Sequence, residues 1–196
     1  MKNLSIKLEI HNKILDSSES IKKSIENIPE IIRIIESITK SLKKGNKIIL
    51  FGNGGSAADA QHIAAELVGR FGYDRKSLSA ISLTADTSVI TSIGNDYSFE
   101  KIFSRQCESL VNKGDVVVGI STSGNSINVK NGLLVSKRKG AKTVGFLGHK
   151  GGHIKNIVDI PLIVNSNSTP RIQEVHRTTA HIICEMVEKN ISRRSK

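Results

Sequence analysis

The first 45 residues carry apolar side chains at the spacing of an α-helix. Isoleucines recur three, four or seven positions apart before Pro29, and a second series that ends at Leu42 follows it. This period places one apolar stripe on each of two helices, and Gly45 is well suited to end the second. Each stripe needs an apolar surface to cover, either this chain's own sheet or another subunit. We therefore expect two N-terminal helices and an oligomer.

Beyond Lys47 the pattern changes to short apolar runs separated by segments of helix length. Runs rich in Val and Ile that alternate with helical segments predict βαβ units and a buried parallel sheet. Pro161 cannot donate a hydrogen bond to a neighbouring strand, so we expect the last run at an edge of the sheet. A final helix is expected to begin near Thr169 as N-cap, with Pro170 after it, and to end near Asn190. The five expected strands are residues 48–51, 80–83, 116–120, 143–147 and 160–164.

The length of the chain sets the number of domains. A chain of 196 residues is long enough for one core and too short for two full-sized ones, and no repeat or low-complexity linker divides it. We expect a single domain over residues 1–196, with N-terminal helices over 1–45 and an α/β core and C-terminal helix over 46–196. The fold class is α/β: a five-stranded parallel sheet flanked by helices in three layers.

Charge and composition narrow the classes of partner. The chain has 29 basic and 18 acidic side chains and a formal net charge of +11, which favours anionic ligands such as phosphorylated metabolites. Only 4% of residues are aromatic and Trp is absent, so a stacking surface for single-stranded nucleic acid is missing. Pairs of lysines and the basic tail 193–196 are interpreted as solvated surface. We expect no nucleic-acid partner, although a nucleic-acid binder remains an alternative on charge alone.

The expected compartment follows from the apolar runs and the cysteines. No run reaches the ~18 apolar residues of a membrane helix, and charges at Lys2, Lys7 and Glu9 interrupt any signal-peptide core. Cys107 and Cys184 lie far apart without C-x-x-C spacing, which argues against a disulfide scaffold or a Cys-rich zinc module. We expect a soluble cytoplasmic protein without a membrane partner.

A glycine-rich turn, Gly-Asn-Gly-Gly-Ser at residues 52–56, follows the first expected strand. The segment from Ser56 to Asp59 resembles the capping box that starts a helix. Backbone N–H groups in such a turn can face a bound anion or a sugar oxygen. The turn also fits a loose dinucleotide fingerprint, with Asp86 as a ribose-binding acid. A nicotinamide-dependent enzyme and a purely structural turn therefore remain alternatives.

A second polar loop, Ser-Thr-Ser-Gly-Asn-Ser at residues 121–126, follows the third expected strand. Both loops belong to the carboxyl edge of one parallel sheet, where open α/β folds bind ligands. The hydroxyl groups and the helix N-terminus behind them suit a phosphate monoester, and the lysine of a triphosphate-binding loop is absent. Polar loops are common, but two at one edge favour a small phosphorylated ligand.

Two expected helices carry side chains suited to acid–base or metal chemistry. His62 and Glu66 are four residues apart, which places them on one face of the helix after the glycine loop. Gln173 and His181 of the last helix are eight residues apart, a rise of ~12 Å, so one unbroken helix cannot bring both to one ion. Either the helix is irregular at its start, or one of the two serves a site in another subunit. The same helix also contains Glu174 and His176.

Four ordered motifs resemble those of the phosphoheptose isomerases in the sugar isomerase (SIS) domain superfamily. They are residues 51–66, 92–97, 120–126, and 169–174 leading to 181–184, and the similarity spans about residues 45–188. The resemblance implies a flavodoxin-like SIS fold, a homotetramer with sites at subunit interfaces, and one zinc ion per subunit. It also implies interconversion of D-sedoheptulose 7-phosphate and D-glycero-D-manno-heptose 7-phosphate through a cis-enediol. That reaction is the first step toward ADP- or GDP-heptose for bacterial surface glycans such as lipopolysaccharide and capsule.

The resemblance also assigns roles to residues of this sequence. It implies Glu66 as the catalytic base and His181 as the acid. Its metal-associated positions are His62, Glu66, Gln173 and His181. Its substrate-binding positions, together with Ser56 of the glycine loop, are Asn53, Gly54, Gly55, Glu66, Asn95, Asp96, Ser121, Thr122, Ser123, Ser126 and Gln173. A non-enzymatic SIS protein that binds a replication initiator is the alternative, and the presence of both Glu66 and His181 argues against it.

Overall fold

The five expected strands form one parallel sheet in the computed structural model, which describes residues 2–72 and 74–192. The strand order is β2-β1-β3-β4-β5, and every neighbouring pair is parallel. β5 is an edge strand, which confirms the prediction from Pro161. The order reverses between β1 and β3, so the loops after these two strands flank a crevice at the carboxyl edge. The strands are β1 (Ile48–Gly52), β2 (Ala80–Ser82), β3 (Val116–Ser121), β4 (Lys142–Gly148) and β5 (Ile160–Val164).

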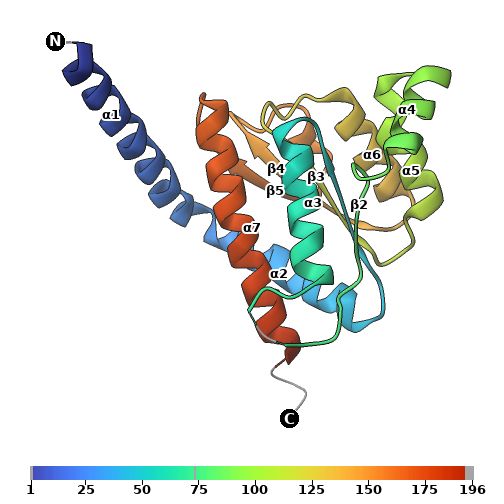
Figure 1. The fold of residues 1–196 in the computed structure, drawn as a ribbon. Helices are drawn as coiled ribbons and strands as arrows, with labels where there is room; N and C mark the ends of the chain where they lie inside the picture. Colours follow the sequence, from blue (N-terminus) through green and yellow to red (C-terminus); the bar gives the residue numbers. More distant parts are fainter. Residues whose placement is uncertain (1, 73, 193–196) are drawn as a thin grey trace.

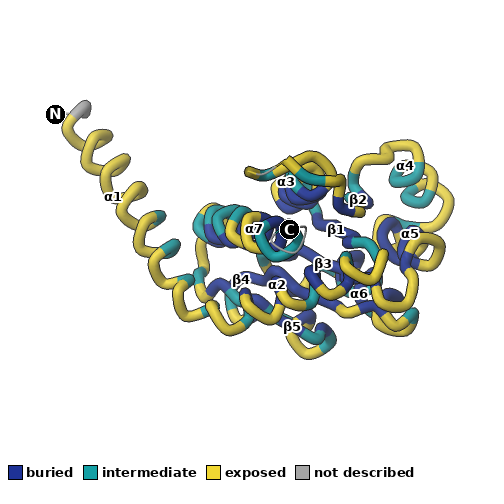
Figure 2. The backbone as a smooth tube through the Cα atoms, turned by 90° about the horizontal axis from the view of Figure 1, so that it is seen from below, coloured by how far each residue is buried: buried dark blue, intermediate teal, exposed yellow. Residues whose placement is uncertain are grey.

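Helices cover both faces of the sheet (Figure 2). α2, α3 and α7 pack on one face, and α5 and α6 pack on the other, with α4 beside them. The α-helices are α1 (Lys2–Lys23), α2 (Ile28–Lys43), α3 (Gly55–Val68), α4 (Thr87–Asp96), α5 (Ile102–Leu110), α6 (Ile127–Arg138) and α7 (Thr169–Ser192). Short 3₁₀ helices are η1 (Ser24–Asn27), η2 (Phe99–Lys101) and η3 (Ile154–Asn156).

Alternate side chains of each central strand belong to different core layers. In β1, Ile48 and Leu50 pack toward α2, α3 and α7, whereas Ile49 and Phe51 pack toward α5 and α6. Because both faces of the sheet are buried, its strands are continuous apolar runs rather than alternating ones. The three-layer α/β prediction is confirmed.

The two N-terminal helices differ in how far their apolar stripes are buried. α2 buries Ile34 and Ile38 against the sheet. α1 projects away from the body of the protein (Figure 1), and the residues Leu4, Leu8 and Ile14 are 75%, 61% and 64% exposed. The chain's own sheet therefore covers one stripe and leaves most of the other open.

Two helix starts differ from the sequence prediction. The capping box at Ser56 is wrong: α3 begins at Gly55 after Gly54, whose φ of 56° suits glycine, and no side chain caps it. Asp59, its expected acidic member, instead accepts a hydrogen bond from Nε of Arg177 in α7 at 2.7 Å. Thr169 is the first residue of α7 and not its N-cap. The basic tail 193–196 lies outside the described residues, within which no helix combines the length and apolarity of a membrane span.

His176 of α7 makes stability depend on pH. Its Nε2 lies 3.2 Å from the carbonyl oxygen of Leu147, and its ring is 5.6 Å from that of Phe146. Burial lowers its pKa from 6.5 to about 4, and the bond to Leu147 and the charge of Asp59 oppose this only in part. Between pH 6.5 and pH 4, His176 therefore binds a proton in the unfolded chain but stays neutral in the native state. This contribution to stability is complete above pH 6.5 and is lost as the pH falls toward 4, by about 3 kcal/mol.

Urea unfolding of the wild type and His176→Gln between pH 7 and pH 4 measures this contribution. The variant should show a flatter loss of unfolding free energy over this window. His153→Gln, which changes an exposed histidine, should keep the wild-type slope. Equal slopes for the wild type and His176→Gln would contradict the assignment.

Candidate functional site

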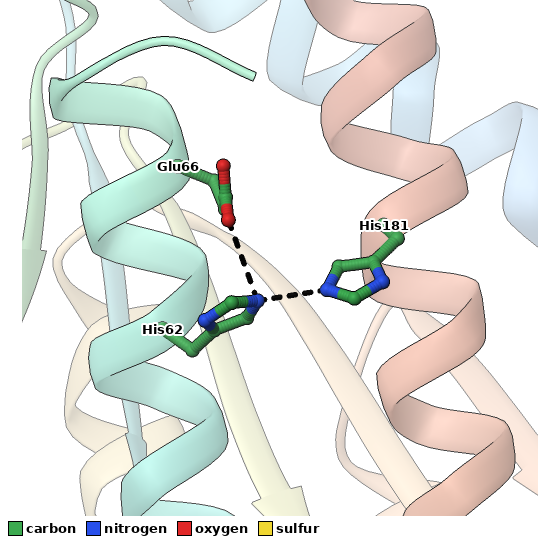
Figure 3. Close-up of side chains that lie close together, drawn as sticks. All are labelled: His62, Glu66 and His181. Carbon is green, nitrogen blue, oxygen red and sulfur yellow. Dashed lines mark hydrogen bonds and ion pairs between the residues drawn. The ribbon is translucent and has the colours of Figure 1, made fainter. Parts of the chain in front are cut away.

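Three ligand-type side chains meet between α3 and α7 (Figure 3). His62 and Glu66 come from α3, on one face as their spacing predicts, and His181 comes from α7. His62 Nε2 lies 2.7 Å from His181 Nε2 and 3.5 Å from Glu66 Oε1. One ligand atom from each of the three side chains lies within 4.8 Å of the other two. The side chains of His62 and Glu66 are 33% and 24% exposed, so solutes can reach the cluster.

The apolar faces of the two helices explain why these side chains meet. α3 buries Ile63 and Leu67 toward the sheet, which leaves His62 and Glu66 on its side facing α7. α7 buries Ala180 and Ile183 in the same core layer, which turns His181 toward α3. The cluster is therefore a product of helix packing.

The contacts within the cluster suit both proton transfer and metal binding. In the contact between the two Nε2 atoms, one ring donates a proton and the other accepts it. One oxygen of Glu66 points to His62, while the second is turned away from both rings (Figure 3). Two imidazole nitrogens and a carboxylate oxygen also form a donor set that zinc accepts. The residues present thus fit a zinc ion.

Gln173 lies elsewhere on α7. This helix is continuous from Thr169 to Ser192, so an irregular start, one of the two explanations open from the sequence, is wrong. The side-chain amide of Gln173 lies against Gly55, where a Cβ atom would overlap it. The structure therefore brings three of the four metal-associated side chains together and places Gln173 beside the glycine loop. Glu174 pairs with Arg171 at 2.5 Å.

The glycine loop is tied to the start of α6 by two amide side chains. Nδ2 of Asn53 donates to Oδ1 of Asn128 at 2.9 Å, and Nδ2 of Asn128 donates to Oδ1 of Asn53 at 2.9 Å. Oδ1 of Asn128 also accepts the N–H of Val129. This reciprocal pair joins the loop after β1 to the first turn of α6, the helix that follows β3. Asn128 was not predicted from the sequence, because its partner Asn53 lies 75 residues away and no motif links the two positions.

The serine-rich loop gathers its hydroxyl groups after β3. Ser121 Oγ lies 2.9 Å from Ser126 Oγ and 3.4 Å from Ser123 Oγ. The carbonyl oxygen of Gly124 accepts the N–H of Ile154, which anchors this loop to the segment after β4. The two polar loops thus lie at the same edge of the sheet, on adjacent strands, as the sequence predicts.

Two expected substrate residues are remote from the cluster within this chain. Asn95 and Asp96 are exposed at the end of α4, where Asn95 Nδ2 donates to Asp96 Oδ1 at 2.9 Å. α3 stands between α4 and α7 across the width of the molecule (Figures 1 and 2). Asp86, the ribose-binding candidate, accepts the N–H of Val89 and caps α4, which gives it a structural role.

Both cysteines are free and buried. Burial raises the pKa of Cys107 to about 11 and that of Cys184 to about 12. Each therefore stays a neutral thiol at physiological pH and is a poor nucleophile.

Comparison with known proteins gives consistent matches. Residues 12–148 match the SIS domain family. The chain is 52% identical to a phosphoheptose isomerase from Geotalea daltonii, over 95% of each chain. It is 51% identical to one from Clostridium acetobutylicum, over 97% of this chain and 96% of the relative. The structure of a phosphoheptose isomerase from Neisseria gonorrhoeae superposes with a TM-score of 0.89 at 36% identity, over 94% of this chain and 99% of that one.

Proposed function

The chain belongs to the SIS domain family and, within it, to the phosphoheptose isomerases, and on this basis we propose that it interconverts D-sedoheptulose 7-phosphate and D-glycero-D-manno-heptose 7-phosphate. The observation that carries the proposal is that Glu66 and His181 meet between α3 and α7, while loop hydroxyls gather at the carboxyl edge of the same sheet. The product would be the first precursor of ADP- or GDP-heptose for bacterial surface glycans, including lipopolysaccharide and capsule.

The reaction moves hydrogen between neighbouring carbons, and two side chains divide the work. Glu66 takes a proton from C1 of the ketose; the C–H electron pair forms the C1–C2 double bond as the O2 carbonyl takes a proton from His181. The resulting cis-enediol then gives the proton of its O1 hydroxyl to His181, which restores the acid, while C2 takes the proton from Glu66, which restores the carboxylate and leaves an aldehyde at C1. A positioned base and acid are needed because a carbon acid next to a carbonyl ionises poorly in water.

The substrate would lie along the crevice between the two polar loops. We assign the phosphate to Ser121, Thr122, Ser123 and Ser126, whose hydroxyls donate hydrogen bonds to phosphate oxygens. The sugar hydroxyls would be bound by Gln173 and by the glycine loop beside it, through Asn53, Gly54, Gly55 and Ser56. We assign Asn95 and Asp96 to the site of a neighbouring copy, because they lie away from the cluster in their own chain. Holding the phosphate would fix the position of the reacting carbons C1 and C2.

A zinc ion fits the same cluster, and we propose one per subunit. His62, Glu66 and His181 would hold it, and Gln173 would join from another copy, because it lies two turns along α7. When bound, zinc would polarise a substrate oxygen as a Lewis acid.

Zinc binding is tested by thermal unfolding of the wild type and His62→Ala. Added Zn²⁺ should raise the wild-type Tm, by an amount equivalent to about 3 kcal/mol at a hundredfold excess over its Kd, and should leave that of His62→Ala unchanged. His153→Ala, which removes an exposed histidine of another loop, should respond as the wild type does. An equal shift in His62→Ala would contradict zinc binding at this cluster.

We further propose that residues 1–196 form one domain that acts as a cytoplasmic homotetramer without nucleic-acid or membrane partners. The exposed apolar stripe of α1 supports assembly. It borders a groove of about 600 Å³ between α1 and the start of α7, which contains Ile10, Ile14 and Arg171. A second copy would cover this surface, and sedimentation equilibrium should give the mass of four chains.

The proposed reaction is tested by NMR of the products formed from purified protein and sedoheptulose 7-phosphate. The aldose phosphate should accumulate to an equilibrium mixture, and repeating the reaction with a chelator shows whether a metal contributes. Absence of any conversion would favour the alternative, a non-enzymatic SIS protein that binds a replication initiator.

A further inference from the structure

A buried ion pair joins the segment after α3 to the last turns of α7. Arg75 Nε lies 2.8 Å from Glu188 Oε1, and their side chains are 5% and 0% exposed. Burying two charges is unfavourable unless each is also well hydrogen-bonded, so the partners of both groups matter.

Arg75 satisfies the carbonyl groups at the end of α3. Its Nη2 donates to the carbonyl oxygen of Glu66 at 3.0 Å, and its Nη1 donates to those of Leu67 and Gly69 at 2.9 and 3.1 Å. The last carbonyls of a helix lack partners within the helix, so the guanidinium group fixes the final turn of α3. Glu66, whose carboxylate belongs to the cluster, is part of that turn.

Glu188 holds the segment that follows α3. Its carboxylate accepts the N–H groups of Phe71 at 3.1 Å and Gly72 at 2.7 Å. The ring of Phe71 lies against the imidazole of His181, with ring centroids 5.8 Å apart. His181 and Glu188 are seven residues apart on α7, about two turns, so both face α3. Glu188 thus reaches His181 through the backbone and ring of Phe71.

We propose that the Arg75–Glu188 pair is a positioning device that holds Glu66 and His181 at their working separation. The pair fixes the backbone of Glu66 from one side and the packing of His181 from the other. Neither residue touches the reacting atoms, so both act through Glu66, Phe71 and His181. The inference deepens the proposed function and rests on it.

A second buried carboxylate offers a matched control. Asp115 pairs with Lys47 Nζ at 2.7 Å and accepts the backbone N–H groups of Lys47 at 3.1 Å and Asn112 at 2.8 Å. Like Glu188, it pairs with a cation and accepts hydrogen bonds from backbone N–H groups. It lies immediately before β3, at the end of the sheet opposite the polar loops. Asp115→Asn should thus destabilise the fold much as Glu188→Gln does, without affecting the cluster.

The test combines steady-state kinetics with NMR of the metal-free protein, at a temperature where each variant is folded. Glu188→Gln should lower kcat with sedoheptulose 7-phosphate by about tenfold or more and leave KM within about twofold, because the phosphate loop is untouched. It should also shift the His181 ring signals, since the ring current of Phe71 moves. Phe71→Leu identifies which signals feel that ring. Asp115→Asn should change neither kcat nor the His181 signals.

If Glu188→Gln fails to fold, the Arg75→Lys variant tests the positioning role of the pair instead. Lysine keeps a charge beside Glu188 but cannot reach all of the carbonyl oxygens to which the guanidinium group donates, so kcat and the His181 signals should both change. Wild-type kcat in every folded variant, or unchanged His181 signals, would overturn the proposal. Failure of the proposed function would give a different result, because the wild type and Asp115→Asn would then show no turnover. The His181 signals alone would in that case test whether the Arg75–Glu188 pair positions the cluster.

Discussion

Glu66→Gln should lower kcat for the isomerisation by about 10³- to 10⁴-fold while the protein still folds and binds sugar phosphate. The amide has nearly the shape of the carboxylate but cannot take the C1 proton. Its oxygen can still face His62, which lies 3.5 Å from Glu66 Oε1, so the packing of α3 on α7 should persist. Progress curves with sedoheptulose 7-phosphate measure kcat, and calorimetric titration measures binding.

Glu185→Gln is the control for this substitution. Glu185 is exposed on α7, one turn after His181, and belongs to neither the cluster nor the polar loops. The Glu185→Gln substitution removes one negative charge near the site, and the variant should keep wild-type kcat. Near-wild-type turnover by Glu66→Gln would show that another group is the base.

His181→Gln should lower kcat by about 10²- to 10³-fold, because the amide cannot deliver a proton to the O2 carbonyl. The terminal group of glutamine lies close to the place of Nε2, the atom that faces His62 at 2.7 Å, so one hydrogen bond of the cluster can remain. The same variant should lose the Zn²⁺-dependent rise in Tm. Kinetics of the metal-free protein therefore report on His181 as the acid, and thermal unfolding with Zn²⁺ reports on it as a ligand.

His153→Gln is the control for this substitution. His153 is an exposed histidine on the loop after β4, and its variant should keep wild-type kcat and the Zn²⁺-dependent rise in Tm. Wild-type turnover by His181→Gln would assign the acid elsewhere.

The fold was predictable from local pattern because each element carries its own signature. β1, β3 and β4 are buried on both faces and are therefore continuous apolar runs, while Pro161 marks the edge strand. The capping box failed because Asp59 has a stronger partner in Arg177, a residue 118 positions away. Local sequence shows what an acidic side chain could do near a helix start, but not which distant cation competes for it.

The candidate site was predictable only in part. The spacing of His62 and Glu66 places them on one face of α3, but the approach of His181 depends on how α7 packs beside that helix. Asn128, Arg75 and Glu188 had no distinguishing spacing, since their partners lie across the crevice or on another helix. Gln173 lies away from the cluster within this chain, against Gly55, as its eight-residue separation from His181 on a continuous helix requires.

The most direct test of the account follows hydrogen at C2 of the product. The purified protein is incubated with sedoheptulose 7-phosphate in D₂O, and the aldose phosphate is examined by proton and carbon NMR. Because a carboxylate that carries the transferred proton exchanges it with solvent, deuterium should appear at C2, at a rate that falls with kcat in Glu66→Gln. An aldose that retains only protium at C2, or equal labelling by Glu66→Gln, would contradict proton transfer by this glutamate.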